Sequence, residues 1–518
     1  MPLTRAVTNY GVVTGVPGEE PTTTVFRGVP FAKPPVGELR LHRPVPPDPW
    51  EGELACDRWP NAPVAEDQIF RNFYPESEDC LYMNIFTPAG SPEDKLPVMF
   101  WIYGGGFRFG SVCNAYNGEH HAGEAWLYTG EAINKKGCIL VTPNYRCSLL
   151  GYGTHPKIIE RDGTGGNYGL WDLIEALRFV HDNIAAFGGD PENVTIFGHS
   201  AGGASVKMLL ASDQTRGLFQ HAIIQSGSGM SGPERVHSPE WVAEWVEKAM
   251  DSLGYTFDDL MTMDVFRLED EIPHRIYELY GGFAPGAPIP WQRRPSVFGP
   301  LADGASLKYD PGIALYAGDY DPDVDIMIGT VLQDNVQPIK ACQDEVKDDP
   351  EILRAIAYSA SVAFGKRCVQ TGRKPIYGYF FERNVPPAKP GVQADRRDTV
   401  PFANRTGPYH GAEFPYIFGK MEFMQKQWTD WDYELQEILI SYWTNFAKRG
   451  NPNGEGLPYW PAFTADTPYD INIRDDAVEA RDLVDTPKGK RVIDHLLTHP
   501  GYTETLKDYI LNEVKEPE

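Results

Sequence analysis

A serine between two glycines, Ser200, is the residue of this chain best suited to act as a nucleophile. It stands in a G-x-S-x-G pattern at 198–202, directly after an apolar run at 194–197 and directly before an apolar stretch that continues to 210. A sharp turn from a strand into a helix leaves no room for side chains beside the serine, which explains the glycines. A chance turn of small residues is the alternative. The strand and helix signals on either side favour a nucleophile whose hydroxyl stands at the carboxyl edge of a sheet.

Three consecutive glycines that end at Gly106 can supply the oxyanion hole that a serine nucleophile needs. They follow an apolar run typical of a strand, and their bare backbone can point several N–H groups at one oxygen. With the amide of Ala201, the amides of Gly105 and Gly106 are predicted to form a three-donor hole. Each such donor is typically worth about 3 kcal/mol of transition-state stabilisation. The aromatic Phe107 that follows argues against a merely flexible turn.

The elements that must position these groups are short apolar strands alternating with helices. Near-continuous apolar runs suit strands that are covered on both faces of a mostly parallel sheet. The helix predicted at 169–186 has apolar residues at three- and four-residue spacing and stops at Gly188. This order predicts an α/β fold with right-handed crossovers. The predicted strands are 98–103, 138–144, 194–197, 222–225, 325–329 and 376–381.

The stretch 238–295 has no strand signal and is predicted to be a helical insertion that caps a site. Its clearest helix is expected at 240–253, and it carries Trp241, Trp245 and Trp291. The length of 518 residues suggests about three domains, although large α/β enzymes often depart from that ratio.

The charge balance argues against nucleic acid and anionic lipid as partners. With 47 Lys and Arg against 72 Asp and Glu, the formal net charge is -25. Such a chain is repelled by phosphate backbones. The first twenty residues show no signal peptide, and the chain has no apolar stretch of 18 residues. A cytoplasmic protein without a membrane span is therefore expected.

Seven cysteines are too few and too scattered for a disulfide framework. Their number is odd and no two form a C-x-x-C pair, so the sequence predicts neither a zinc site nor a set of bridges. Reduced thiols are the simpler expectation.

Several longer segments make the chain resemble the type-B carboxylesterases, the cholinesterase-like branch of the α/β-hydrolase fold. The two signature segments are EDCLYMNI at 78–85 and GHSAGGAS at 198–205. The resemblance implies one α/β-hydrolase domain over residues 1–518, with the insertion at 238–295 lining a gorge, in place of three domains. Further matching segments are found at 26–32, 144–146, 166–172, 185–191 and 409–416.

The resemblance also implies a catalytic triad. Ser200 matches the nucleophile, and His410 lies in a segment similar to the catalytic-histidine loop. Asp334 falls where the family usually has Glu, with Asn335 in place of a glycine. An aspartate can still fix the imidazole tautomer. Asp303, in a segment similar to a stretch ahead of the acid strand, is the rival candidate for the acid.

The substrate pocket is where the chain departs from cholinesterases. His199 replaces the carboxylate that precedes their nucleophile, and the segment around Arg71 lacks the expected tryptophan, so choline esters are not expected. His199 itself is expected to line the pocket rather than to act as the base. Arg108 and Arg71 could meet a substrate carboxylate or phosphate. The alternative is that each is solvated or salt-bridged. Phe107 is a candidate for an aromatic pocket wall, although aromatic residues near a core more often simply pack.

Other matching residues are better interpreted as architecture. Arg40 with Glu78, and Arg146 with Asp172, resemble the family's buried salt bridges. Ser226 looks like the family's supporting serine, which hydrogen-bonds the triad acid.

The expected reaction is hydrolysis of small to medium carboxylic esters through an acyl-enzyme, with no metal or cofactor. Hydrolysis of a lactone, thioester or amide by the same triad is the nearest alternative. A non-catalytic binding protein of the cholinesterase-like kind is the other, but such members typically lack the serine. A small-molecule ester is the expected partner, and the sequence is silent on oligomeric state.

Overall fold

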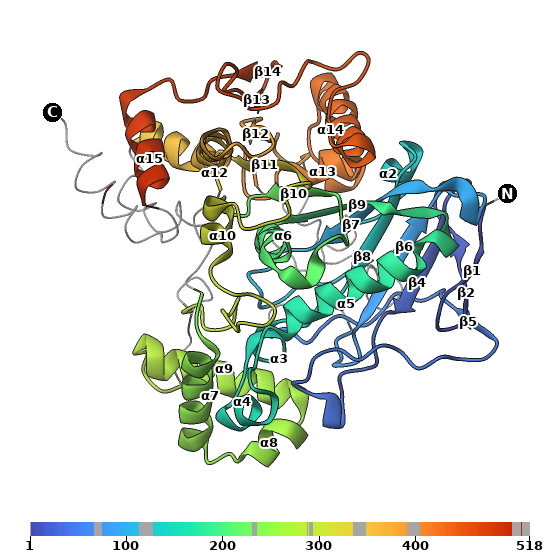
Figure 1. Ribbon diagram of the computed structural model, residues 1–518, viewed down its shortest axis with the longest axis vertical. Helices are drawn as coiled ribbons and strands as arrows, with labels where there is room; N and C mark the ends of the chain where they lie inside the picture. The colour runs from blue at the N-terminus through green and yellow to red at the C-terminus, as the bar shows by residue number, and fades with distance from the viewer. Residues whose placement is uncertain are drawn as a thin grey trace.

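An 11-stranded sheet forms the centre of the computed structural model (Figure 1). The structure describes residues 2–66, 75–112, 128–229, 236–286, 289, 294–334, 349–390, 405–499 and 509. Within them, the seven strands β7 to β13 are neighbours in the sheet and run parallel, with β8 at one end of the group and β13 at the other. Antiparallel strands flank this group on both sides. The order is β14 (Val478–Arg481), β13 (Asp470–Ile473), β12 (Tyr377–Phe381), β11 (Asp325–Val331), β10 (His221–Gln225), β9 (Gly189–His199), β7 (Leu96–Ile102), β8 (Ile139–Pro143), β6 (Tyr82–Thr87), β4 (Thr24–Pro30) and β3 (Val16–Pro17).

The six strands predicted from apolar runs are confirmed as β7 to β12. They are neighbours in the middle of the sheet, where every residue of β8 and β10 is buried. Burial on both faces explains why their sequences are continuously apolar. A separate sheet of β1 (Arg5–Val7), β2 (Val12–Thr14) and β5 (Glu53–Ala55) packs near the N-terminus.

Helices cover both faces of the sheet. On β9, Gly198 faces α6 (Ala201–Ala211), whereas the neighbouring Phe197 stacks on Phe418 beside α13 (Phe414–Ile417). Successive strand residues point to opposite faces, so α6 and α13 lie on opposite sides. The remaining helices outside the insertion are α2 (Glu131–Lys135), α3 (Ser148–Tyr152), α4 (Pro156–Asp162), α5 (Tyr168–Asn183), α10 (Pro311–Ala317), α12 (Pro350–Thr371), α14 (Asp430–Arg449) and α15 (Pro487–Thr498).

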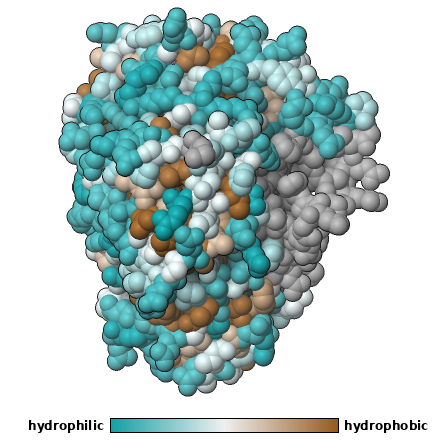
Figure 2. All heavy atoms as spheres, turned by 90° about the vertical axis from the view of Figure 1, so that its right-hand side faces the viewer, coloured by the Kyte–Doolittle hydropathy of each residue, from teal (hydrophilic) through white to brown (hydrophobic). Residues whose placement is uncertain are grey.

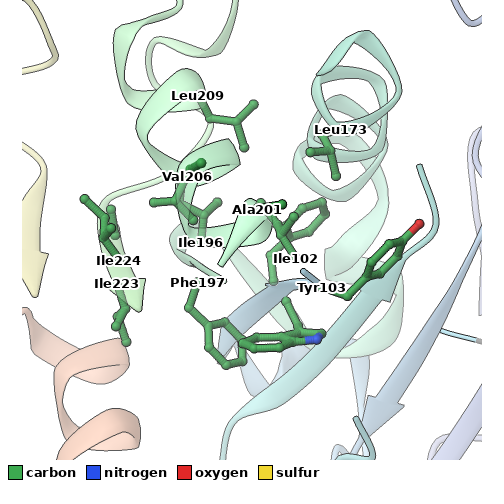
Figure 3. Close-up of a cluster of buried hydrophobic side chains, with 14 of the residues drawn as sticks. Ile102, Tyr103, Leu173, Ile196, Phe197, Ala201, Val206, Leu209, Ile223 and Ile224 are labelled. Atoms are coloured by element: carbon green, nitrogen blue, oxygen red, sulfur yellow. The ribbon is translucent and has the colours of Figure 1, made fainter. Parts of the chain in front are cut away.

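The helix predicted at 169–186 is confirmed as α5. It passes into a 3-10 turn, Ile184–Phe187, and ends at Gly188, whose φ of 82° only glycine adopts readily. Figure 3 shows its Leu173 in a cluster of buried side chains from α6 and the central strands. This core fixes the strand and helix that flank Ser200.

The described part of the predicted insertion forms three helices. They are α7 (Pro239–Leu253), α8 (Phe257–Thr262) and α9 (Val265–Gly281), which lie together with α4 at one end of the molecule (Figure 1). Arg40 ties this end to the main body. Its guanidinium binds both carboxylate oxygens of Glu78, at 2.7 and 2.6 Å, and donates to the Met263 carbonyl at 2.8 Å. The predicted Arg40–Glu78 ion pair is therefore confirmed.

The second predicted ion pair is also confirmed. Arg146 donates to Asp172 through Nε at 2.9 Å and Nη2 at 2.7 Å, and both side chains are buried. The pair joins the segment after β8 to α5. Loss of either partner would leave an uncompensated buried charge and destabilise the fold. The Arg146–Asp172 pair therefore has a structural role.

The surface is largely polar, as expected of a highly charged chain, and the described cysteines are unpaired. Figure 2 shows a largely hydrophilic face with small, separate hydrophobic patches. No helix of the described residues is long and apolar enough to cross a membrane. The five described cysteines, Cys56, Cys80, Cys138, Cys147 and Cys368, are buried free thiols.

Near one edge of the sheet, a buried carboxyl group makes stability depend on pH. Asp470 on β13 accepts a hydrogen bond from Ser361 of α12 through Oδ2, whereas its buried Oδ1 has no hydrogen-bond partner in the described structure. Burial raises the pKa of Asp470 from 3.8 to about 7. The folded protein therefore keeps a proton that the unfolded chain has released between about pH 4 and pH 7. The free energy of unfolding falls as pH rises through this window.

We therefore expect Asp470→Asn to raise the free energy of unfolding by about 2–4 kcal/mol more at pH 8 than at pH 4, measured by urea denaturation. Asp432 is the matched control. Although burial alone would raise its pKa, hydrogen bonds from Arg383 hold the pKa of Asp432 below its usual value, so Asp432→Asn should destabilise at pH 8. Equal effects of Asp470→Asn at both pH values would show that this carboxyl group is not kept neutral.

Candidate active site

Ser200 occupies a strained turn between β9 and α6. Its φ of 58° and ψ of -123° are unusual for a residue with a side chain. The flanking Gly202 explains how the turn fits, because a Cβ there would lie 2.0 Å from the Ile102 carbonyl oxygen of β7. The G-x-S-x-G pattern thus has the strand, turn and helix that the sequence predicts.

The glycine turn after β7 lies directly against Ser200. A Cβ on Gly104 would lie 3.0 Å from Ser200 Cβ and 3.6 Å from its Oγ. Gly105 and Gly106 follow with φ values of 116° and 63°, and Ala201 is the first residue of α6. The three residues predicted to supply oxyanion donors therefore come from the two segments that meet at Ser200.

His410 and Asp334 form a short hydrogen bond. His410 Nδ1 lies 2.6 Å from Asp334 Oδ1, and the Asp334 side chain is fully buried. The loop after β11 pairs with the segment before His410, where the Gln333 amide donates to the Pro408 carbonyl at 2.9 Å. This pairing aligns an acid and an imidazole that lie far apart in the sequence.

The rival acid, Asp303, has a different task. Its Oδ1 accepts the backbone N–H groups of Ala305, Ser306 and Leu307 at 2.8–3.1 Å, so the carboxylate closes its own turn. Of the two candidates, Asp334 is the one that contacts His410.

His199, the residue before the serine, packs against the ring of His410. The ring centroids are 4.2 Å apart, and Phe414 meets His199 edge-on at 4.4 Å. Burial lowers the pKa of His199 well below its usual value, and the neighbouring His410 lowers it further. The neutral ring of His199 thus supports one side of the His410 ring. Because His199 directly precedes Ser200, this contact places His410 next to the nucleophile turn.

Glu413 is a buried acid that the sequence prediction missed. Gln225 Nε2 lies 3.5 Å from Glu413 Oε1, and Trp443 Nε1 donates to Gln225 Oε1 at 3.2 Å. Burial raises the pKa of Glu413 to about 7, and the charge of Asp334 contributes to the rise. The available signal was an acidic residue inside the otherwise apolar stretch 412–418.

The expected hydrogen bond from Ser226 to the triad acid is absent from the described structure. The Ser226 amide is anchored to the Gly329 carbonyl of β11 at 2.8 Å, and its buried Oγ has no hydrogen-bond partner there. The strand end thus holds Ser226 through its backbone, and the expectation about its hydroxyl was wrong.

The candidate pocket residues take different positions. Phe107 is buried and meets Tyr152 edge-on at 5.2 Å, so it packs in the core. The Arg108 side chain, 14% exposed, lies beside Glu66, which corresponds to the salt-bridged alternative. Arg71 lies outside the described residues.

Known proteins share the sequence pattern and the fold of this chain. The carboxylesterase family model matches residues 4–361 and 351–487. Para-nitrobenzyl esterase of Bacillus subtilis (strain 168) is 30% identical over 504 residues, 89% of this chain and 92% of that protein. Fumonisin B1 esterase of Sphingopyxis macrogoltabida is 30% identical over 496 residues, 88% of this chain and 84% of that protein. A solved structure, a thermophilic PNB esterase, has a TM-score of 0.73 at 27% identity and covers 95% of this chain and 99% of that one.

The fold and the family matches together define an α/β hydrolase. The chain belongs to the carboxylesterase family and is a hydrolase that acts on carboxylic esters.

Proposed function

We propose that the protein hydrolyses small to medium carboxylic esters through an acyl-enzyme on Ser200. The observation that carries this proposal is the 2.6 Å contact between His410 Nδ1 and Asp334 Oδ1. The ring of His410 packs on His199, the residue before the strained Ser200. An acid that holds Nδ1–H leaves the other ring nitrogen of the imidazole as the base. The names of the relatives, a para-nitrobenzyl esterase and a fumonisin B1 esterase, agree with small-molecule esters as substrates.

In the first half-reaction, His410 Nε2 takes the Ser200 proton as the hydroxyl oxygen attacks the ester carbonyl. The amides of Gly105, Gly106 and Ala201 bind the oxygen as it becomes negative. The tetrahedral intermediate collapses, and His410 gives its proton to the departing alcohol.

In the second half-reaction, water replaces the alcohol. His410 takes a proton from water as it attacks the acyl carbonyl, and the same amides bind the new oxyanion. Ser200 leaves with the proton from His410, and the carboxylic acid is released. Asp334 stabilises the imidazolium in both halves and keeps its own charge.

A trapping experiment tests the covalent step. With a p-nitrophenyl ester in excess, we expect a burst of about one p-nitrophenol per enzyme if deacylation is slower than acylation. Acid quenching followed by peptide mass spectrometry should place the acyl group on the peptide that contains Ser200. The same quench of a Ser200→Ala variant supplies the control, and an acyl adduct on another residue of the active enzyme would contradict the proposal.

A further inference from the structure

Three charged side chains, Glu66, Arg108 and Arg294, meet beside the glycine turn and are named the Glu66 cluster. Arg108 Nε lies 3.7 Å from Glu66 Oε2, and Arg294 Nη1 lies 3.3 Å from Glu66 Oε1. The three side chains are only 3%, 14% and 15% exposed, respectively. A carboxylate that is this buried needs compensating charge, and the two guanidinium groups provide it.

The cluster is attached to the glycine turn through the backbone as well as through side chains. The Arg108 amide donates to the Gly105 carbonyl at 3.1 Å and closes the turn. The Glu66 amide donates to the Arg108 carbonyl, also at 3.1 Å. Glu66 therefore holds both the main chain and the guanidinium group of the residue that ends the turn.

The same cluster holds the chain that follows the insertion helices. Arg108 Nη2 donates to the carbonyls of Arg294 at 3.3 Å and Pro295 at 2.9 Å. Both guanidinium groups lie over the ring of Tyr277 on α9, at 5.8 and 6.0 Å. Glu66 thus links the glycine turn to the end of the insertion.

A turn built from glycines has little preference of its own for one conformation, so contacts from outside must fix it. Gly105 is already tightly placed, because a Cβ there would lie 2.0 Å from the Phe109 carbonyl oxygen. We infer that Glu66 is a positioning residue for the oxyanion hole, acting through Arg108 to hold the amides of Gly105 and Gly106 in place. This inference rests on the proposed function of those amides.

Glu66→Gln tests the inference, because it keeps the size of the side chain and removes its charge. We expect kcat for p-nitrophenyl acetate to fall about 10- to 100-fold with KM nearly unchanged, since a misplaced donor weakens only transition-state binding. The serine hydroxyl adds to the carbonyl of a trifluoromethyl ketone, and the ketone oxygen then lies in the hole as an oxyanion. The affinity for such a ketone should fall by a similar factor. Arg108→Gln should act alike, and the double variant should lose little more than the worse single variant.

Glu78→Gln is the matched control. Glu78 is also a shielded carboxylate, 12% exposed, and its partner Arg40 likewise donates to insertion backbone at Met263. The described contacts of this pair do not include the glycine turn. We expect Glu78→Gln to lower the melting temperature while kcat and ketone affinity stay at wild-type values.

Wild-type kcat and ketone affinity in folded Glu66→Gln would overturn the inference, and inactivity of Ser200→Ala would then leave the proposed function standing. An active Ser200→Ala variant would refute the proposed function itself. If Glu66→Gln does not fold, Arg108→Gln carries the same expectation. A loss in Arg108→Gln that is confined to anionic esters would also overturn the inference, because it would assign the guanidinium group to the substrate.

Discussion

Replacing Ser200 with alanine is expected to lower kcat for p-nitrophenyl esters by at least about four orders of magnitude. The variant keeps the glycine turn and the His410–Asp334 pair, but it has no oxygen that can form the acyl-enzyme. Any remaining rate comes from the oxyanion donors and from substrate binding, which together give a far smaller acceleration. Steady-state kinetics on purified protein, with active-site titration to exclude contamination by wild type, measures the loss.

Ser205→Ala provides the control on the same helix. Ser205 is buried, and its Oγ donates to the Ala201 carbonyl at 2.9 Å, so its removal perturbs α6 without removing the nucleophile. Its kcat should stay within about threefold of wild type. If both variants lose activity to the same degree, or if Ser200→Ala remains active, Ser200 is not the nucleophile.

The centre of the fold could be predicted from the sequence because its elements have strong local signals. β8 and β10 are buried on both faces and therefore read as unbroken apolar runs. Two of the strands that were not predicted, β14 and β1, show the opposite pattern. β14 has one buried residue in four, and β1 has one in three, so neither carries a clear apolar pattern. Their positions come from pairing with neighbours rather than from their own composition.

The parts of the site divide in the same way. The serine turn and the glycine turn are local, and their glycines are visible in the sequence. A Cβ on Gly105 or Gly202 would lie only 2.0 Å from a carbonyl oxygen, and the φ of 63° at Gly106 favours glycine. The choice of Asp334 over Asp303 needed the family resemblance, since the two acids can be told apart only by which one reaches His410. The role of Glu66 could not be predicted from any local pattern, because its partner Arg294 is more than 200 residues away in the sequence. Long-range charge clusters of this kind exist only once the chain is folded.

The identity of the acid gives the second large expected effect. In Asp334→Asn, the amide can present its NH₂ group to His410 Nδ1, which favours the tautomer with the proton on Nε2. That nitrogen then cannot accept the Ser200 proton, and the imidazolium also loses its counter-charge. We expect kcat to fall by about four orders of magnitude while KM changes little. Kinetics at saturating p-nitrophenyl ester measures this loss.

Asp303→Asn separates the loss of the acid that orients His410 from the general effect of removing a hydrogen-bonded acid. The asparagine Oδ1 can still accept the three backbone N–H groups that Asp303 binds now, so the turn should persist and kcat should stay near wild type. Because Asp303 contacts its own turn and Asp334 contacts His410, the two variants should differ by about three to four orders of magnitude in kcat. The reverse pattern, an active Asp334→Asn beside an inactive Asp303→Asn, would mean that the 2.6 Å contact is structural and that the imidazole is oriented by another group.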